Sequence, residues 1–276
     1  MMPELPEVET ITREMREAKL EGRTIEKAQI FWERTIATPS PSIFSKKIVG
    51  QKILNISRRG KFIILTLSKE SLLIHLRMTG KFLIAKEQIK PDSHERVRLF
   101  LDDGRILRYE DQRKFGKWYL VKNPDEVLGA LGIEPLSENF TLSTFQKILT
   151  GHHRQIKPFL LDQHYIAGLG NIYVDEALWV SKIHPLRSVS TLTKKEIKAL
   201  HEAIPIVLQT GIKNIGTSLG AARANYFSVS GRRGSNQNAL NVFRKDGLPC
   251  PRCNTTIKKM TVGQRGTHYC PVCQSQ

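Results

Sequence analysis

Residues 156–179, IKPFLLDQHYIAGLGNIYVDEALW, decide the fold of the second half of the chain. Two apolar stretches with helical spacing flank residues 168–171, so the sequence predicts two helices joined by a tight turn. Glycines let a backbone approach a ligand closely, and the free N–H groups at a helix start bind phosphate. We expect Asn171 to cap the second helix and to donate to an anion. An ordinary helical hairpin without a ligand fits this stretch, taken alone, better.

Further helices and an irregular region surround this stretch. Several segments with helical spacing follow residue 140, and the long one over residues 194–212 contains Pro205, which we expect to bend it. Residues 214–247 are rich in Gly, Ser and Asn, which predicts irregular structure. We therefore expect two domains, an N-terminal one over residues 1–135 and a helical one that starts at residue 136, with residues 136–240 as its helical part and 241–276 as a cysteine module.

The first half of the chain carries a different pattern. Val8, Ile11 and Met15 recur at helical spacing, so the chain opens with a helix. Short β-rich segments follow as far as residue 122, separated by turn signals such as DDG and interrupted by a second helix at PSIFSKKIV. Regular short strands predict an antiparallel sandwich or barrel. The fold class is therefore α+β.

The charge points to a polyanionic partner. Lys and Arg number 43 against 26 Asp and Glu, which gives a net charge of +17 over 276 residues. From residue 210 to the end, ten basic residues accompany a single acid, Asp246. Such a field attracts nucleic acid, the leading partner class. A solvated basic face without a partner is the weaker alternative, because the imbalance is so concentrated.

The sequence predicts a cytosolic protein with no membrane partner. The first twenty residues carry glutamates and arginines, which the apolar core of a signal peptide excludes. The longest apolar runs, such as FIILTL at residues 62–67, are too short to cross a bilayer. All four cysteines lie in the last 27 residues, in pairs rather than scattered like a disulfide framework.

These cysteines predict a metal site. CPRC and CPVC are separated by sixteen residues, and in this spacing two facing turns complete a thiolate tetrahedron. Four thiolates close the coordination sphere, so we expect one structural Zn²⁺. A redox pair fits poorly, because there are two pairs and no βαβ context. His268 could replace one ligand, but four cysteines leave it no vacancy: the ligands are Cys250, Cys253, Cys270 and Cys273.

The segment between the cysteine pairs, IKKMTVGQRGTHY, predicts a β-hairpin with Arg265 at its GQRG tip. A cation between glycines at such a tip suits contact with phosphate. An ordinary exposed turn residue is an equally good interpretation of the spacing alone.

Several motifs, taken in order, resemble one family. PELPEVET, RRGKF, HLRMTGKF, DQRKFG, AGLGNIYVDEALW and GQRGTHYCPVC are similar to motifs of bacterial formamidopyrimidine-DNA glycosylases, from Pro3 to Cys273. The resemblance implies a bifunctional DNA glycosylase/AP lyase of base excision repair. Such an enzyme excises oxidised purines, 8-oxoguanine and formamidopyrimidines, through a Schiff base on an N-terminal proline, and β,δ-elimination then cuts the strand.

The same resemblance implies the architecture and the partners. It implies an N-terminal antiparallel β-sandwich with flanking helices, a helical helix-two-turn-helix domain and a β-hairpin zinc finger. It also implies one structural zinc ion, damaged double-stranded DNA as the partner, a monomer, and a place in the bacterial cytoplasm with the nucleoid.

The resemblance makes Pro3 the nucleophile, and elementary chemistry agrees. An α-amine has a pKa of about 7.7–8.0 against about 10.4 for lysine, so more of it is free base at neutral pH. A proline amine can attack the sugar C1′ and leave an iminium ion. Glu4 would act as general acid/base, and Glu7 would support the site, although both acids also suit the start of a helix. Because Pro3 must be N-terminal, we expect translation to start at Met2, which is then removed.

Other roles follow from matched positions. The resemblance gives Lys61 a phosphate contact and a part in the lyase steps. Without the family, Lys61 would be a solubilising residue at a strand edge, and Met78 and Phe115 would be core residues. The trio implied to fill the gap left by an everted base is Met78, Arg113 and Phe115. The implied DNA contacts are His94, Arg113, Lys157 and Asn171, with Arg265 implied for phosphate contact and the second elimination.

One segment departs from the family. GTSLGAARANYFSVSGRRGSNQNALNVFRKDG, residues 216–247, stands where the family has a GGS motif and an Arg-Tyr loop over the flipped base. The preference among lesions is therefore open, whereas we expect the catalytic chemistry to be unaffected. Two alternatives stay open: an endonuclease VIII-like glycosylase for oxidised pyrimidines, and a non-enzymatic, zinc-dependent protein that binds damaged DNA and needs no free Pro3.

Overall fold

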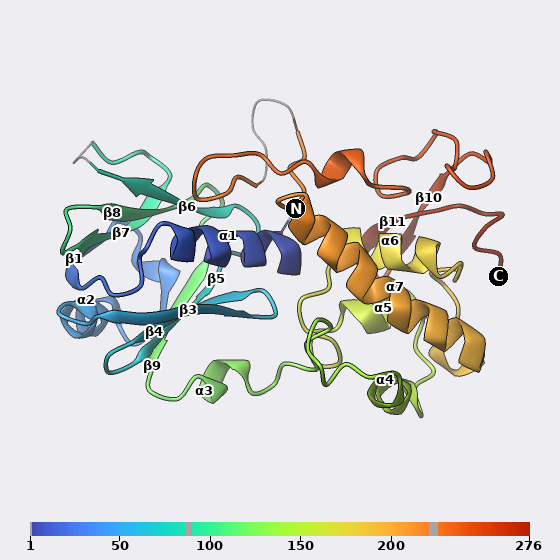
Figure 1. The fold of residues 1–276 in the computed structure, drawn as a ribbon, viewed down its shortest axis with the longest axis horizontal. Coiled ribbons are helices and arrows are strands. Elements are labelled where there is room, and N and C mark those ends of the chain that lie inside the picture. The colour runs from blue at the N-terminus through green and yellow to red at the C-terminus, as the bar shows by residue number, and fades with distance from the viewer. Residues whose placement is uncertain (1, 87–89, 221–225) are drawn as a thin grey trace. The chain divides into compact units, whose positions relative to one another are not determined.

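The structure is a computed structural model that describes residues 2–86, 90–220 and 226–276. The chain divides into two compact units, each described by itself (Figure 1). Unit 1 comprises Met1–Ala130 and Asn214–Gln237, and unit 2 comprises Leu131–Lys213 and Asn238–Gln276. We expected translation to start at Met2 rather than at Met1. Met1 lies outside the described residues.

Unit 1 is built on two β-sheets, with strand orders β1-β7-β8-β6 and β2-β9-β5-β4-β3. Short turns join β3 to β4, β4 to β5 and β7 to β8, as the turn signals of the sequence indicated. The strands are β1 (Ile25–Ile30), β2 (Ile36–Thr38), β3 (Ile53–Arg59), β4 (Phe62–Leu67), β5 (Ser71–His75), β6 (Gly80–Ala85), β7 (Glu95–Leu101), β8 (Ile106–Asp111) and β9 (Lys117–Val121).

The two sheets enclose one apolar core, which confirms the predicted sandwich. Alternate residues of β4, namely Ile63, Leu65 and Leu67, are buried in it, as the two-residue period of a strand requires. The ring centroid of Trp118 on β9 lies 5.8 Å from that of Phe82 and 5.3 Å from that of Tyr109. Since Phe82 and Tyr109 belong to the other sheet, aromatic rings join the two layers.

One strand pair differs from the antiparallel pattern that we expected. β2 runs parallel to β9, with Ile36 opposite Trp118. Parallel neighbours need a long crossover connection, and these two strands lie far apart in the sequence. No local turn signal therefore predicts their pairing.

Helices α1 (Leu5–Glu17) and α2 (Pro41–Ile48) confirm both helices predicted for this half. α1 packs on β3 and β4, and its residues Val8, Ile11 and Met15 are fully buried. α2 begins at Pro41, where a proline costs no hydrogen bond, and packs on β1. Two short helices complete unit 1: η1 (Glu33–Thr35) and α3 (Asp125–Leu128).

Unit 2 is helical and surrounds α6 (Asn171–Val180), which packs against α5, α7 and β11. A Cβ atom added at Gly211 of α7 would lie 2.5 Å from the hydroxyl of Tyr173, so α7 approaches α6 this closely only with glycine there. The predicted helices and hairpin are confirmed. They are α4 (Leu142–Leu149), α5 (Ile156–Leu161), α7 (Lys194–Lys213), β10 (Lys258–Val262) and β11 (Arg265–Tyr269), with the short turn η2 (Val189–Thr191). The short turn η3 (Asn236–Asn238) begins in unit 1 and ends at the first residue of the last segment of unit 2.

The division into units differs from the expected domain boundaries at residues 214–237. This segment, expected with the helical domain, belongs to unit 1, because its backbone bonds to side chains of α1. It is irregular apart from η3, as its composition predicts. Residues 221–225 of the divergent loop lie outside the described residues.

Candidate DNA-processing site

The N-terminal end of α1 gathers the expected nucleophile, the expected general acid/base and the expected supporting acid, Pro3, Glu4 and Glu7. Pro3 and Glu4 are buried just ahead of the helix. The backbone N–H of Glu4 donates to Glu7 Oε2 at 2.9 Å, and the N–H of Thr217 donates to Glu7 Oε1 at 2.7 Å. Glu7 therefore ties the Glu4 backbone to a segment 210 residues further along the chain.

Gly216 makes this contact possible. Its φ is +80°, a conformation that L side chains rarely adopt, and an added Cβ would lie 2.9 Å from Glu7 Cγ. The sequence analysis missed Thr217 as a partner of Glu7. No local pattern connects positions so distant, although the glycine before Thr217 is a signal of close backbone approach.

Lys61 lies directly before β4, and His75 ends β5, the neighbouring strand of the five-stranded sheet. Lys61 precedes β4 and is 5% exposed, and its neighbour Phe62 pairs with His75. Burial, and to a smaller extent the positive charges of Arg77 and Lys61, lowers the pKa of His75 to about 3. The imidazole is therefore neutral near pH 7. It accepts at Nδ1 from the N–H of Arg77 at 3.0 Å, so its own proton is on Nε2.

His75 is a candidate site residue that the sequence did not predict. The available signal was a histidine at the end of the strand SLLIH, two residues before the arginine of HLRM. A titratable ring in that place, next to Lys61 and held neutral, has the chemistry of a hydrogen-bond donor without charge.

The residues expected to fill the gap left by a base lie on two loops of unit 1. Met78, on the β5–β6 loop, is half-buried. Arg113 and Phe115 are on the β8–β9 loop, where the guanidinium carbon lies 4.8 Å from the ring centroid. Phe115 is 48% exposed, so it is no core residue. The N–H of Arg113 donates to Thr79 Oγ1 at 3.0 Å, which brings the two loops together.

A backbone hydrogen bond connects His94 to Asp111, the residue before the β8–β9 loop. The His94 side chain is 46% exposed, and Nδ1 lies 3.1 Å from Asp92 Oδ1. Its carbonyl oxygen accepts from the N–H of Asp111, which precedes the β8–β9 loop. An exposed imidazole at this place remains suited to contact with DNA.

Lys157 requires a revision of its expected role. Its side chain is fully buried, and Nζ donates to Asp175 Oδ1 at 2.6 Å and to Thr267 Oγ1 at 2.8 Å. A direct DNA contact needs an exposed ammonium group, whereas this one is held inside unit 2. Asp175 also accepts from the N–H of His268 at 2.9 Å, so the ion pair fixes the zinc hairpin to α5 and α6.

Asn171 does not cap α6, contrary to the sequence prediction. The N-cap is Gly170, and Asn171 is the first residue of the helix. Its side-chain amide donates instead to the carbonyl oxygen of Gly266 at 2.8 Å. This bond places the start of α6 next to Gly266 of the hairpin. Arg265, the residue before Gly266, is exposed.

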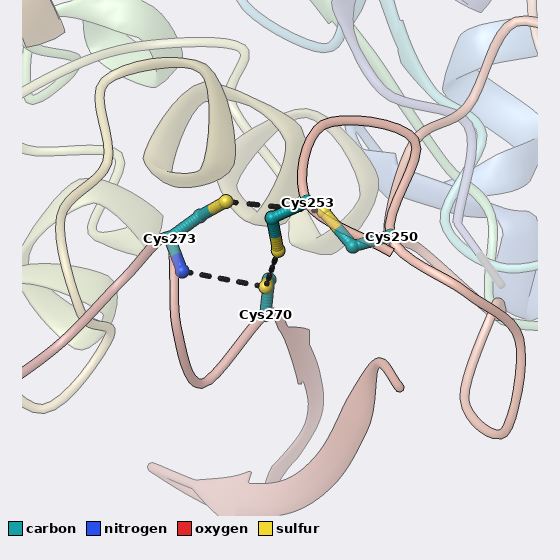
Figure 2. Close-up of side chains that lie close together, drawn as sticks. All are labelled: Cys250, Cys253, Cys270 and Cys273. Atoms are coloured by element: carbon teal, nitrogen blue, oxygen red, sulfur yellow. Dashed lines mark hydrogen bonds between the residues drawn. The ribbon is translucent and has the colours of Figure 1, made fainter. Parts of the chain in front are cut away.

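The four cysteines converge from the two ends of the hairpin (Figure 2). Their sulfur atoms all lie within 4.8 Å of one another. Tetrahedral Zn–S bonds of about 2.3 Å place sulfur atoms about 3.8 Å apart. The Cys250–Cys273 and Cys253–Cys270 sulfur distances of 4.0 and 3.4 Å fit this geometry, so the residues suit one structural zinc ion.

Comparison with known proteins identifies the family. Residues 2–118 match the formamidopyrimidine-DNA glycosylase N-terminal domain, and residues 131–222 match the H2TH domain of the same glycosylase. Residues 247–276 match a zinc finger found in FPG and IleRS. These matches define a DNA glycosylase. The chain belongs to the formamidopyrimidine-DNA glycosylase family.

Full-length relatives support this conclusion. The chain is 46% identical to formamidopyrimidine-DNA glycosylase of Protochlamydia amoebophila, over all of both chains. It is 45% identical to that of Enterococcus faecalis, over 99% of this chain and 97% of the relative.

Solved structures agree with the sequence relatives. A Lactococcus lactis FPG variant bound to Fapy-dG-containing DNA is 39% identical, with a TM-score of 0.91 over 99% of this chain and 100% of that one. The Lactococcus lactis Fpg complex with abasic-site DNA has the same identity and coverage and a TM-score of 0.90.

Among the described residues, no helix is both long and apolar enough to cross a membrane.

Proposed function

We propose that this glycosylase removes oxidised purines from double-stranded DNA with the N-terminal amine of Pro3. The observation that carries the proposal is the buried cluster of Pro3, Glu4 and Glu7 at the start of α1, in a chain of this family. The Pro3 nitrogen is an amide while Met2 precedes it, and becomes a secondary amine when Met1 and Met2 are absent.

The chemistry follows from that amine. Its lone pair forms a bond to C1′, and the bond from C1′ to the base breaks, with its electron pair leaving on the base, which takes up a proton. Glu4 donates a proton to the ring oxygen as the sugar opens, which leaves an iminium between Pro3 and C1′. Loss of a C2′ proton then expels the 3′ phosphate, and a second elimination expels the 5′ phosphate.

The other residues bind and orient the DNA in this proposal. Lys61 supplies positive charge beside the reacting sugar, and His75 supplies a neutral donor next to it. In unit 2, Arg265 and the start of α6 at Asn171 bind backbone phosphate, because exposed guanidinium and helix N–H groups suit anions. Lys157 supports them by holding the hairpin.

The lesion range is proposed from the relatives. The Lactococcus lactis structures contain Fapy-dG and abasic-site DNA, which favours purine lesions here. The divergent segment at residues 216–247 keeps oxidised pyrimidines as the second candidate. We further propose that the enzyme acts as a monomer in the bacterial cytoplasm, with the nucleoid.

Borohydride trapping tests the proposal. Protein that begins at Pro3 is incubated with an 8-oxoguanine·cytosine duplex and reduced, and the adduct is mapped by mass spectrometry. We expect one covalent adduct at Pro3. The matched control is the same chain with Met2 retained, which should form no adduct at Pro3 because its proline nitrogen is an amide.

Two results would contradict parts of the proposal. An adduct with an abasic duplex but none with 8-oxoguanine would keep the Pro3 lyase and move the substrate to another lesion class. Absence of any adduct from the chain that begins at Pro3 would favour a protein that only binds damaged DNA.

A further inference from the structure

The buried carboxylate of Asp111 joins the two loops that carry Met78 and Phe115. Asp111 ends β8 and is 1% exposed. Its Oδ1 accepts from the hydroxyl of Thr79 at 2.5 Å, and its Oδ2 accepts from the N–H of Gly116 at 2.7 Å. Thr79 directly follows Met78, and Gly116 directly follows Phe115. One side chain therefore fixes the backbone beside both apolar residues.

Arg113 is held by the same group. Its N–H lies 3.2 Å from Asp111 Oδ1 and 3.0 Å from Thr79 Oγ1. The Asp111 backbone is fixed in turn, because its N–H donates to the carbonyl of His94 at 2.9 Å and its carbonyl accepts from Arg96 Nε at 2.8 Å. All three members of the trio are thus linked through one anchored residue.

The donors to this carboxylate are uncharged. Within the described parts of the chain, hydroxyl and backbone N–H groups bind it, and no Lys, Arg or His side chain forms an ion pair with it. A buried carboxylate without a cation is stable only when hydrogen bonds replace its water. An apolar residue would fill the space at lower cost, so what the Asp111 carboxylate secures is the geometry of the two loops.

Tyr109, two residues earlier on β8, packs against Gly80 and Gly116, which directly follow the residues that Asp111 holds or are held by it. A Cβ atom added at Gly116 would lie 1.7 Å from the Tyr109 hydroxyl, and one added at Gly80 would lie 2.4 Å from it. Such distances exclude any side chain at either position without a shift of the ring or the backbone. The loops therefore rest directly on one fully buried aromatic residue.

We propose that Asp111, acting with Thr79, is a positioning residue that holds Met78, Arg113 and Phe115 ready to enter the duplex. The inference rests on the proposed function, in which these three side chains replace an everted base. Unstacking a base step costs free energy, which a wedge offsets only through the contacts that it gains. Loops ordered before binding avoid an additional loss of conformational entropy at that step.

Thr79 offers a matched pair of variants. Thr79→Val keeps the shape and removes the hydroxyl that bonds to Asp111, whereas Thr79→Ser keeps the hydroxyl. Each is compared with the wild type, all beginning at Pro3, in two assays. The first is single-turnover excision from a fully paired 8-oxoguanine duplex, and the second is borohydride trapping on a single-stranded abasic site, which needs no wedge.

We expect Thr79→Val to excise about tenfold more slowly from the duplex, since one hydrogen bond corresponds to about that factor. We expect it to trap on the single strand at the wild-type rate, and Thr79→Ser to restore duplex excision. Wild-type excision by Thr79→Val would overturn the inference, as would an equal loss in both assays, which indicates a merely structural role. An inactive wild type would instead refute the proposed function.

Discussion

At the scale of single residues, His75 illustrates how burial and charge act on one ring. Burial, together with the charges of Arg77 and Lys61, lowers its pKa from about 6.5 to about 3. The imidazole of His75 therefore binds a proton below pH 6.5 in the unfolded chain but only below about pH 3 in the folded chain. The stability that neutral His75 contributes is complete above pH 6.5 and is lost as the pH falls toward 3.

His75→Asn tests this linkage. The Asn amide oxygen takes the place of Nδ1 as acceptor for the N–H of Arg77, and the variant has no titrating group. Between pH 4 and 6 we expect the stability of the wild type to fall with decreasing pH more steeply than that of the variant, by about 1.4 kcal/mol per pH unit. Urea unfolding at several pH values measures both slopes. Parallel slopes would mean that His75 titrates normally in the folded protein.

Lys157 and Arg265 give a second prediction at this scale. A phosphate contact contributes about 0.9 to the slope of log K against log salt concentration. Because Lys157 is buried, we expect Lys157→Met to lower stability by about 3 kcal/mol, as loss of one partner of a buried ion pair does, with the salt slope unchanged. We expect Arg265→Met to reduce the slope by about one contact, since Arg265 is exposed.

Both variants are compared by DNA binding across a salt series at a temperature where circular dichroism shows them folded. A reduced salt slope for Lys157→Met would show that Lys157 contacts phosphate directly, as expected from the sequence. An unchanged salt slope for Arg265→Met would show that Arg265 does not bind phosphate.

At the scale of elements, α1 is attached to residues 214–237 at two places. Glu7 binds the N–H of Thr217, and Glu14 binds the N–H of Ser230 at 2.9 Å and Arg232 at 2.7 Å. Burial alone would raise the pKa of Glu14, but the hydrogen bonds from Ser230 and Arg232 outweigh it, so the pKa is lowered. The helix next to the proposed nucleophile thus also holds the divergent segment at Thr217 and again at Ser230 and Arg232.

Glu14→Gln should loosen the second attachment. A carboxyl with a lowered pKa stabilises the fold above its ordinary pKa of 4.5, and this contribution is lost as the pH falls further. At pH 7 we therefore expect faster amide hydrogen exchange at residues 226–237 in the variant, with exchange in α1 unchanged. At pH 3.5 the difference from the wild type should shrink. Equal exchange at pH 7 would show that Glu14 does not hold the loop.

At the scale of the whole molecule, each unit has its own core. The zinc cysteines pack with Trp179, Val242 and Ile257 in a small cluster of unit 2, and the Trp179 ring N–H donates to Cys250 Sγ at 3.4 Å. The large core of unit 1 draws its residues from the two sheets, from α1 and from residues 226–229. Loss of metal should therefore affect the units unequally.

Chelation tests this division. Removal of zinc should release one ion per chain, unfold residues 247–276 and weaken DNA binding, because free thiolates do not hold the hairpin. Unit 1 should keep its cooperative thermal transition. Metal release is followed with a colorimetric chelator, and unfolding by calorimetry and by hydrogen exchange. Simultaneous loss of both transitions would mean that the two units fold as one.

The sequence by itself determined the helices, the strand-rich half, the zinc ligands and the family, because hydrophobic period, turn residues and cysteine spacing are local. Only the tertiary structure decided the parallel pairing of β2 with β9, the attachment of Thr217 and Ser230 to α1, and the burial of Lys157. It also decided that Gly170 rather than Asn171 caps α6, and that one carboxylate joins the loops of Met78 and Phe115. These features join residues that lie far apart in the chain, or depend on what surrounds a side chain. Local spacing carries no information about either.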